Sequence, residues 1–295
     1  MSHPDICIYH GNCADGFGAA WAVWKRWGDA VEFVPGIYGK APPDVTGKNV
    51  LMVDFSYKKA LLETMAVTAT SIIILDHHKT AQADLAEFTA SDITSPGPDY
   101  EIACGAKIAA RFDMEKSGAV LAWEFCFPGK PIPFLLQHIQ DRDLWRFALE
   151  NTREIQAAVF SYPYDFPTWD NLIEECEHGE GIPDLAAEGI AIERKHHKDI
   201  DELLDVSMRY MTIGGHRVPV ANLPYTMSSD AAGKLAEGNA FAACYFDRAD
   251  ARVFSLRSRG PDGADVSEIA KQYGGGGHKN AAGFQVPIGW EGDPP

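Results

Sequence analysis

The sequence predicts an α/β protein in which a Rossmann-like, parallel-sheet N-terminal domain is joined by a linker helix to a smaller α/β domain. In the first half of the chain, short apolar runs alternate with segments of helical periodicity, which is typical of a parallel sheet with crossover helices. After Gly214-Gly215 the pattern changes to alternating strand-like runs. The length of 295 residues also exceeds that of a typical single core and favours two domains.

The first half contains three predicted strands, each a short apolar run bounded by turn residues or by a helical pattern. They are Ile6–Tyr9, Asn49–Val53 and Ser71–Leu75. The predicted helices carry apolar residues at a spacing of three or four, which places those residues on one face. They are Gly16–Trp27, Lys58–Val67, Ser117–Phe127 and Ile132–Gln140.

The second half begins with a long polar-apolar stretch from Asp184 to about Tyr210, which predicts a connecting helix. The strand-like runs that follow are Val218–Leu223, Ala240–Phe246 and Arg252–Arg257. We therefore predict a domain over residues 1–184, a linker helix over 185–214 and a second domain over 215–295.

The charge balance limits the class of partner. The chain has 42 acidic and 26 basic residues, a formal net charge of −16. A surface of that sign repels long polyanions, so the balance disfavours a processive duplex-binding protein but allows a small phosphate ester. No apolar stretch approaches the roughly 20 residues of a membrane span, and no leader pattern opens the chain. We expect a cytoplasmic protein, and no feature indicates an obligate protein partner.

His and Asp residues follow each of the first three predicted strands. The first run ends in His10, with Asp15 shortly after it; the second ends in Asp54; the third ends in Asp76-His77-His78. In open α/β sheets, ligands bind outside the carboxyl ends of the strands. Any one of these residues is explained as well by a helix or turn cap. The three ends together favour a shared metal site.

Carboxylate oxygens and imidazoles suit Mn²⁺ or Mg²⁺ better than a structural zinc ion. A pair of such ions can stabilise both the attacking and the leaving oxygen of a phosphoryl transfer. The acidic cluster around Asp141 and Asp143 follows the helix predicted to end at Gln140. As an isolated feature it is typical of a solvated loop. Beside the strand ends we predict that Asp141 closes the metal site, with Asp143 as the alternative.

A glycine-rich segment near the C-terminus predicts an anion site, because glycines let backbone N–H groups approach a ligand closely. It contains Gly275, Gly276, Gly277 and His278, and lacks the ending of a nucleotide P-loop. A flexible linker is the alternative, which the aromatic and apolar flanks disfavour. Upstream, Arg257-Ser258-Arg259 ends a predicted strand with two guanidinium groups that can grip phosphate or form surface ion pairs.

Taken in order along the chain, these motifs resemble the DHH phosphoesterase superfamily, whose name describes the triplet seen here as Asp76-His77-His78. The glycine-rich segment ending in His278 is similar to the DHH-associated domain of RecJ-type exonucleases and nanoRNases. The resemblance implies a Rossmann-like domain joined by a helix to a smaller α/β domain, with the active site between them. It also disfavours the pyrophosphatase branch, which has a different C-terminal domain.

The resemblance further implies a cofactor of Mn²⁺, usually as a pair, and roles for particular residues. Asp54 would bridge the two ions, and Asp15, His77 and Asp141 would complete one site. His10 would belong to the other site, and His78 would lie behind the ligands or near the phosphate. The second domain would hold the substrate through Arg257, Ser258, Arg259 and His278.

Cys13 stands where many members of the superfamily carry an aspartate. It would either ligate as a thiolate, which favours a softer metal, or leave that metal site weak. The other cysteines are scattered, without a Cys-x-x-Cys pair, and are expected to be reduced core residues.

These features predict a metal-dependent phosphodiesterase that hydrolyses short oligonucleotides, linear or cyclic dinucleotides, or related nucleotide phosphoesters. An alternative is an exonuclease on longer single-stranded DNA or RNA. A third hypothesis is a non-catalytic nucleotide-binding module in which Cys13 marks a decayed metal site.

Overall fold

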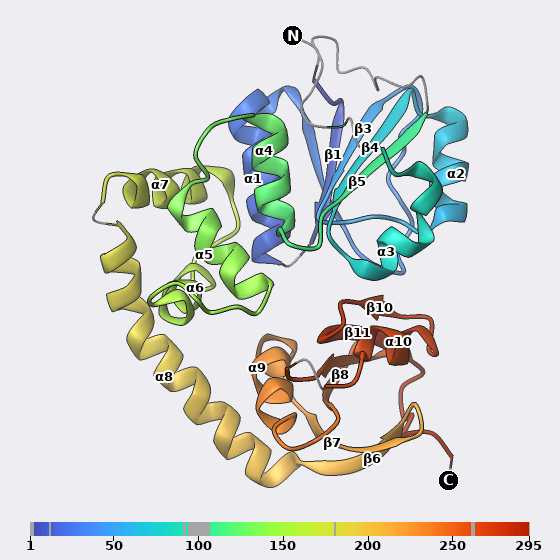
Figure 1. The fold of residues 1–295 in the computed structure, drawn as a ribbon, viewed down its shortest axis with the longest axis vertical. Helices are drawn as coiled ribbons and strands as arrows, with labels where there is room; N and C mark the ends of the chain where they lie inside the picture. The colour runs from blue at the N-terminus through green and yellow to red at the C-terminus, as the bar shows by residue number, and fades with distance from the viewer. Residues whose placement is uncertain are drawn as a thin grey trace. The chain divides into compact units, whose positions relative to one another are not determined.

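The computed structural model describes residues 3–11, 13–90, 93, 107–179, 181–260 and 263–294. The chain divides into two compact units, Met1–Glu193 and Arg194–Pro295, which are described separately below (Figure 1). Among the described helices, none is both long enough and apolar enough to cross a membrane.

Among the described residues, the first unit contains a five-stranded sheet in which all neighbours are parallel, in the order β2-β1-β3-β4-β5. The strands are β1 (Ile6–His10), β2 (Glu32–Gly36), β3 (Asn49–Val53), β4 (Ser71–Asp76) and β5 (Ile108–Phe112). The predicted α/β class with a parallel first sheet is confirmed. Strand β2 was not predicted from the sequence. It is an edge strand that contains glutamate and proline, a composition tolerated at an edge.

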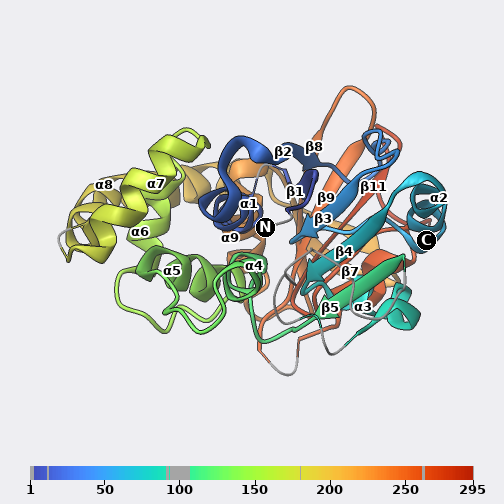
Figure 2. The same ribbon diagram turned by 90° about the horizontal axis from the view of Figure 1, so that it is seen from above.

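Helices cover both faces of this sheet (Figures 1 and 2). Helix α1 (Ala14–Trp27) and helix α4 (Gly118–Cys126) pack on one face, where Leu51 and Val53 of β3 point. Helix α2 (Lys59–Thr68) packs on the other face, against Val50 and Met52. The remaining helical segments are α3 (Lys79–Asp84), α5 (Phe134–Asp143), α6 (Thr152–Val159), α7 (Phe166–Glu177), α8 (Gly181–Ser207), η1 (Gly28–Ala30) and η2 (Ala86–Phe88).

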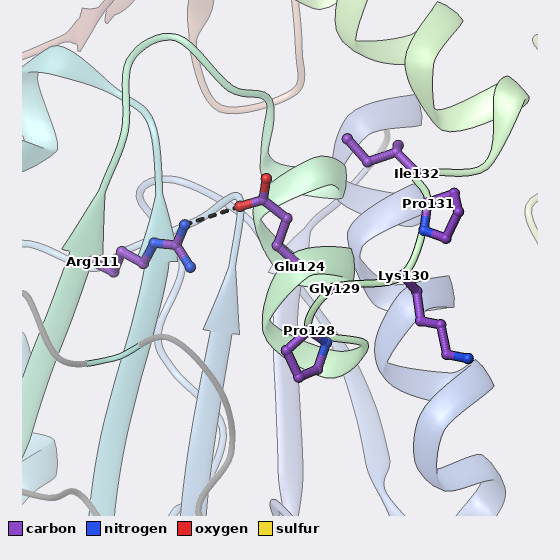
Figure 3. A pocket seen from close by; sticks show the side chains of 7 residues that line it. All are labelled: Arg111, Glu124, Pro128, Gly129, Lys130, Pro131 and Ile132. Atoms are coloured by element: carbon purple, nitrogen blue, oxygen red, sulfur yellow. Dashed lines mark hydrogen bonds and ion pairs between the residues drawn. The ribbon is translucent and has the colours of Figure 1, made fainter.

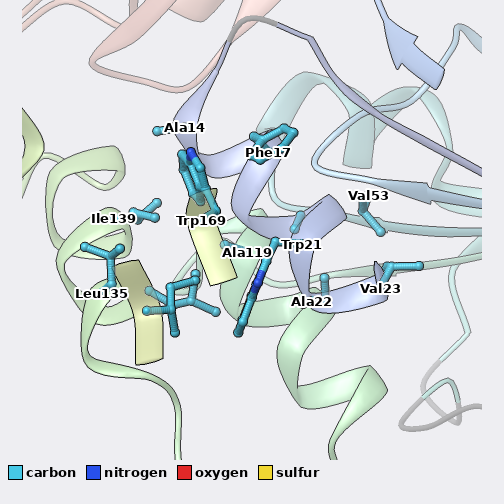
Figure 4. Close-up of a cluster of buried hydrophobic side chains, with 14 of the residues drawn as sticks. Ala14, Phe17, Trp21, Ala22, Val23, Val53, Ala119, Leu135, Ile139 and Trp169 are labelled. Carbon is cyan, nitrogen blue, oxygen red and sulfur yellow. The ribbon is translucent and has the colours of Figure 1, made fainter. Parts of the chain in front are cut away.

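The core on the α1 face extends beyond the sheet into the helices that follow α4. Figure 4 shows Phe17 and Trp21 of α1 with Ile139 of α5 and Trp169 of α7. Trp21 and Trp169 are at most 1% exposed, so these rings are packing residues rather than a surface for base stacking. This core fixes α1 and α5, the two helices whose ends carry Asp15 and Asp143, against the sheet.

The strand order locates where a ligand is expected. Strand β1 lies between β2 and β3, so the chain winds to one side of β1 and then crosses to the other. In doubly wound sheets with this order, ligands bind at the carboxyl ends of the two strands where the winding reverses. Here those strands are β1 and β3, and they end next to His10 and Asp54.

The second unit has a mixed six-stranded sheet in the order β10-β11-β9-β8-β7-β6 among its described residues. The predicted linker range 185–214 covers most of α8 but also β6, because the helix ends at Ser207 and β6 already belongs to this sheet. The elements are β6 (Arg209–Ile213), β7 (His216–Asn222), α9 (Tyr225–Leu235), β8 (Ala242–Asp247), β9 (Arg252–Arg257), α10 (Val266–Lys271), β10 (Gly276–Gly277) and β11 (Ala281–Val286).

Candidate metal centre

The residues predicted from the strand ends lie together at one edge of the first sheet. Strand β1 ends at His10, Asp54 directly follows β3, and β4 ends at Asp76 ahead of His77. The three strands are parallel neighbours, so their carboxyl ends share an edge. Asp54 has a positive φ of 54°, a conformation that few residues other than glycine adopt, and its N–H donates to the carbonyl of Leu75 at 2.9 Å.

The imidazole of His77 lies close to three carboxylates. Its Nε2 is 3.0 Å from Asp54 Oδ1 and 3.5 Å from both Asp15 Oδ2 and Asp143 Oδ2. One ligand atom each from Asp15, Asp54 and His77 lie within 4.8 Å of one another, and all three side chains are buried. A buried group of acidic oxygens around one imidazole can hold a divalent cation.

The electrostatics of this cluster show a shortage of positive charge. Burial and the neighbouring carboxylates of Asp54 and Asp143 raise the pKa of Asp15 well above its ordinary value. Burial also raises the pKa of Asp143. The pKa of Asp54 shifts in the opposite direction. Burial alone would raise this pKa, but hydrogen bonds with His10 and His77 hold it below the ordinary value. A divalent cation would let the carboxylates stay ionised together.

A second group of ligands gathers at the other oxygen of Asp54. His10 Nδ1 lies 3.3 Å from Asp54 Oδ2, and the thiol of Cys13 lies 3.9 Å from the same oxygen. His10, Asp54 and His78 also form a group whose ligand atoms lie within 4.8 Å of one another. Asp54 therefore belongs to both groups, as expected of a carboxylate shared by two cations.

Asp76 serves the two histidines rather than the cluster itself. Its Oδ1 accepts hydrogen bonds from the backbone N–H groups of His77, at 2.7 Å, and His78, at 3.2 Å. The same oxygen lies 2.6 Å from His78 Nδ1. Such carboxylate–histidine pairs orient the ring and leave its other nitrogen for a ligand. These contacts suit a role in positioning the two histidines, and the catalytic role predicted for the triplet stays a prediction.

The structure brings Asp143 to the cluster and turns Asp141 away from it. Asp141 accepts hydrogen bonds from the N–H groups of Ala148 and Leu149, at 2.8 and 3.0 Å, and from the hydroxyl of Thr152 at 2.7 Å. Helix α5 continues to Asp143 instead of ending at Gln140, so the two aspartates point about 200° apart around the helix. Asp141 organises the turn after α5.

The first turn of α4 holds Asp15, a feature that the sequence analysis did not identify. The N–H groups of Gly118 and Ala119 donate to the two oxygens of Asp15 at 2.6 and 3.0 Å. A Cβ at Gly118 would lie 2.3 Å from the Cβ of Asp54, so only glycine fits. A signal existed: Ser117 before an apolar helical run marks a helix N-terminus, and its side chain accepts from the N–H of Val120.

The cysteines that the structure describes are four buried core residues and Cys13, which lies beside the carboxylate cluster. Burial and the carboxylates of Asp54, Asp143 and Asp15 raise the pKa of the Cys13 thiol well above its ordinary value. Cys104 lies outside the described residues. The buried, unbridged cysteines are Cys7, Cys126, Cys176 and Cys244.

In the second unit, the two predicted phosphate-binding segments are neighbours. The N–H of Ser258 donates to the carbonyl of Asn280 at 3.1 Å, and the Asn280 amide donates to the Ser258 hydroxyl at 2.9 Å. These contacts join Arg257-Ser258-Arg259 to the glycine-rich segment, whose Gly276 and Gly277 form the short strand β10. A Cβ at Gly275 would lie 2.1 Å from the carbonyl oxygen of Gly283. The segment is therefore packed closely against β11 and is not a flexible linker.

The two arginines of this segment already have partners. Arg257 donates to the hydroxyl of Ser229 at 2.6 Å, and Arg259 pairs with Glu237 at 2.7 Å. The Arg259 pair is half exposed, which matches the surface ion pair considered from the sequence. The substrate-binding role of these residues and of His278 stays a prediction.

A surface pocket of about 560 Å³ lies at the other end of α4 from the carboxylate cluster (Figure 3). In this pocket Arg111 pairs with Glu124 at 3.0 Å. It contains none of the predicted site residues. The residues that line it are Arg111, Glu124, Pro128, Gly129, Lys130, Pro131 and Ile132.

Comparison with known proteins identifies relatives by sequence and by fold. No family model matches the chain. The chain is 33% identical to "Uncharacterized protein R106" of Acanthamoeba polyphaga mimivirus over 301 residues, which span 95% of the chain and 67% of that protein. Among solved structures, it resembles the DHH domain of a member of the s1p family of ribosomal proteins. That likeness has a TM-score of 0.57 and 14% identity, and covers 97% of the chain and 83% of the other.

A second solved structure is that of PggH, a pGpG-specific phosphodiesterase of Vibrio cholerae. The alignment covers 96% of the present chain and 93% of the PggH chain, with 14% identity and a TM-score of 0.47.

The fold is that of a solved DHH domain, and the triplet Asp76-His77-His78 stands at the end of β4. By sequence, the chain belongs to the same family as the mimivirus protein R106.

Proposed function

We propose that this protein is a divalent-metal-dependent phosphodiesterase acting on short oligonucleotides, linear or cyclic dinucleotides, or related nucleotide phosphoesters. One observation carries the proposal: three carboxylates, from Asp15, Asp54 and Asp143, converge within 3.5 Å of His77 Nε2 at the carboxyl ends of the strands. Buried oxygen and imidazole ligands of this kind suit Mn²⁺, with Mg²⁺ as the other candidate.

Two groups of residues would hold the cations. Asp15, Asp54, Asp143 and His77 form the first group, and Asp54 also serves the second group through its other oxygen. When bound, such cations stabilise the negative charge of a phosphoryl transfer and lower the pKa of water. The N–H groups at the start of α4 hold the Asp15 carboxylate in place.

The second unit would bind the substrate phosphate. Support comes from the joined segments Arg257-Ser258-Arg259 and Gly275–His278, which combine guanidinium groups with backbone N–H groups of a glycine-rich strand edge. The net charge of −16 favours a small anion over a long strand, whose binding relies on many cationic contacts.

A substrate panel with Mn²⁺, Mg²⁺ or a chelator tests the proposal. We expect hydrolysis of dinucleotides and of oligonucleotides a few residues long with Mn²⁺, and no hydrolysis with chelator. Asp54→Asn should abolish turnover. Asp44→Asn is the matched control, because Asp44 is exposed in a loop and hydrogen-bonds Thr46; it should keep full activity.

Two results would contradict this assignment. A full degradation ladder from a long end-labelled single strand at low enzyme would show an exonuclease. Failure to cleave dinucleotides and bis-p-nitrophenyl phosphate with any divalent cation, while nucleotide binding is retained, would show a non-catalytic module.

A further inference from the structure

Tyr38 is an aromatic residue beside the candidate metal centre that is not itself a candidate ligand. Its ring centroid lies 5.5 Å from that of His10 and 6.4 Å from that of His78, with interplanar angles of 66° and 79°. Both histidines belong to a group of candidate ligands around Asp54. Tyr38 is nonetheless 41% exposed. Its ring therefore offers aromatic surface to a ligand that reaches the centre.

A tight turn presents Tyr38. The N–H of Lys40 donates to the carbonyl of Ile37 at 3.0 Å, which closes a four-residue turn with Tyr38 at its second position. Gly39 follows with a φ of 83°, a conformation that glycine adopts without strain. The turn comes after β2, which is parallel to β1 and ends at the same edge of the sheet. Tyr38 is therefore held at the edge where the candidate ligands lie.

A buried ring packs against Tyr38. The centroid of Phe55 lies 4.7 Å from that of Tyr38, and Phe55 is fully buried. A Cβ at Gly36 would lie 2.7 Å from two atoms of the Phe55 ring, so this ring fills the space that the glycine leaves. Tyr57 makes an edge contact with Phe55 at 4.9 Å. Because its support is packed, Tyr38 loses little conformational freedom when a ligand covers it.

We propose that Tyr38 is the stacking surface for the nucleobase next to the scissile phosphate, so that the protein selects nucleotides over other phosphodiesters. The inference rests on the proposed function, in which the phosphate binds at the metal centre. One sugar separates a base from its phosphate, so the base can reach a ring that packs beside two candidate ligands. Every base has a π-face, so Tyr38 would recognise the presence of a base rather than its identity.

Binding of matched ligands tests this role without an activity readout. The ligands are a dinucleotide with a non-hydrolysable methylenephosphonate linkage and its two abasic forms, each lacking one base. Isothermal titration with Mn²⁺ present gives each Kd. We expect the wild type to bind the complete ligand about 5–100-fold more tightly than one of the abasic forms. Tyr38→Leu should remove that difference and keep the affinity for that abasic form, whereas Tyr38→Phe should preserve the difference because the ring remains.

Tyr210→Leu is the matched control. Tyr210 is 47% exposed and lies on β6 of the second unit, so its replacement should keep the wild-type preference. Thermal unfolding of each variant verifies the fold.

Three results would overturn the inference. They are a wild type with no preference for the complete ligand, an equal loss of affinity for all ligands in Tyr38→Leu, and a lost preference in Tyr38→Phe, which would indicate a hydroxyl contact. In each case hydrolysis of dinucleotides with Mn²⁺ would leave the proposed function standing. A wild type that prefers the complete ligand but cleaves no phosphodiester would instead contradict the proposed function alone.

Discussion

Asp54 is the residue that connects the two ligand groups. Each of its oxygens faces a different histidine, His77 at 3.0 Å and His10 at 3.3 Å. Its positive φ is tolerated better by aspartate than by most other side chains, and its N–H is fixed by the carbonyl of Leu75. Strained backbone at a buried charged residue is a common feature of functional sites. The carboxylate is therefore placed by the strand end rather than by a flexible loop.

Asp143 and Asp141 should separate activity from stability. Asp143→Asn removes a carboxylate next to His77, and we expect activity to fall by more than the roughly 10–100-fold typical of lost outer-shell partners. Asp141→Asn weakens a buried acceptor of three hydrogen bonds and should cost about 1–3 kcal/mol of unfolding free energy. Thermal unfolding and steady-state kinetics of both variants measure the two effects.

Each variant serves as the control for the other. Asp143→Asn should unfold at the wild-type temperature, and Asp141→Asn should keep its bound metal. If Asp141→Asn instead lost metal at unchanged stability, the assignment of the two aspartates would be reversed.

At the scale of single residues, the sequence predicted most of the side chains that the structure brings together. The positions of His10, Asp54 and His77 after predicted strands were enough to predict that they lie together, because parallel neighbouring strands end at one edge of the sheet. It was not enough to choose between Asp141 and Asp143. That choice depends on where α5 ends, and helix ends are poorly defined by apolar periodicity alone.

Helix α4 is the element that supports the site from the side. Its first two N–H groups bind Asp15, and the absence of a side chain at Gly118 lets the helix approach Asp54. The N-terminus of a helix favours negative charge, and this partly opposes the burial and the neighbouring carboxylates that raise the pKa of Asp15.

Gly118→Ala should therefore damage the metal site. The added Cβ would meet Asp54 Cβ at 2.3 Å, so either the helix or the carboxylate must move. We expect metal affinity to fall at least about tenfold, with about 1–3 kcal/mol of destabilisation from overpacking. Isothermal titration with Mn²⁺ measures the affinity.

Ser117→Ala provides the comparison for that variant. It removes the cap that accepts from the N–H of Val120 and should cost about 1 kcal/mol without moving Asp54. Equal loss of metal affinity in both variants would mean that helix stability, rather than close approach to Asp54, controls the site.

Elements were predicted well where periodicity was strong and poorly where composition was mixed. Strands β3 and β9 have the predicted bounds, and α2 is displaced by one residue at each end. In the second sheet β6, β10 and β11 were not predicted. In the first sheet β2 and β5 were missed. The first contains Glu32 and Pro35, and the second contains Arg111 in a run too short for a clear pattern.

At the scale of the whole molecule, the order of elements predicted the class and the parallel first sheet. The strand order β2-β1-β3-β4-β5 could not be read from the sequence, since it depends on how successive units wind on the sheet. In that order the winding of the chain reverses between β1 and β3, beside His10 and Asp54. The ligand site expected from the topology is therefore the place where the candidate metal ligands lie.

The most direct test of the account is the anomalous scattering of a crystal grown with Mn²⁺, recorded at the manganese absorption edge. The account predicts a peak within about 2–2.5 Å of ligand atoms from Asp15, Asp54 and His77, and loss of that peak in Asp54→Asn. A well-ordered crystal with no peak at these residues, or with its manganese bound elsewhere on the chain, would contradict it.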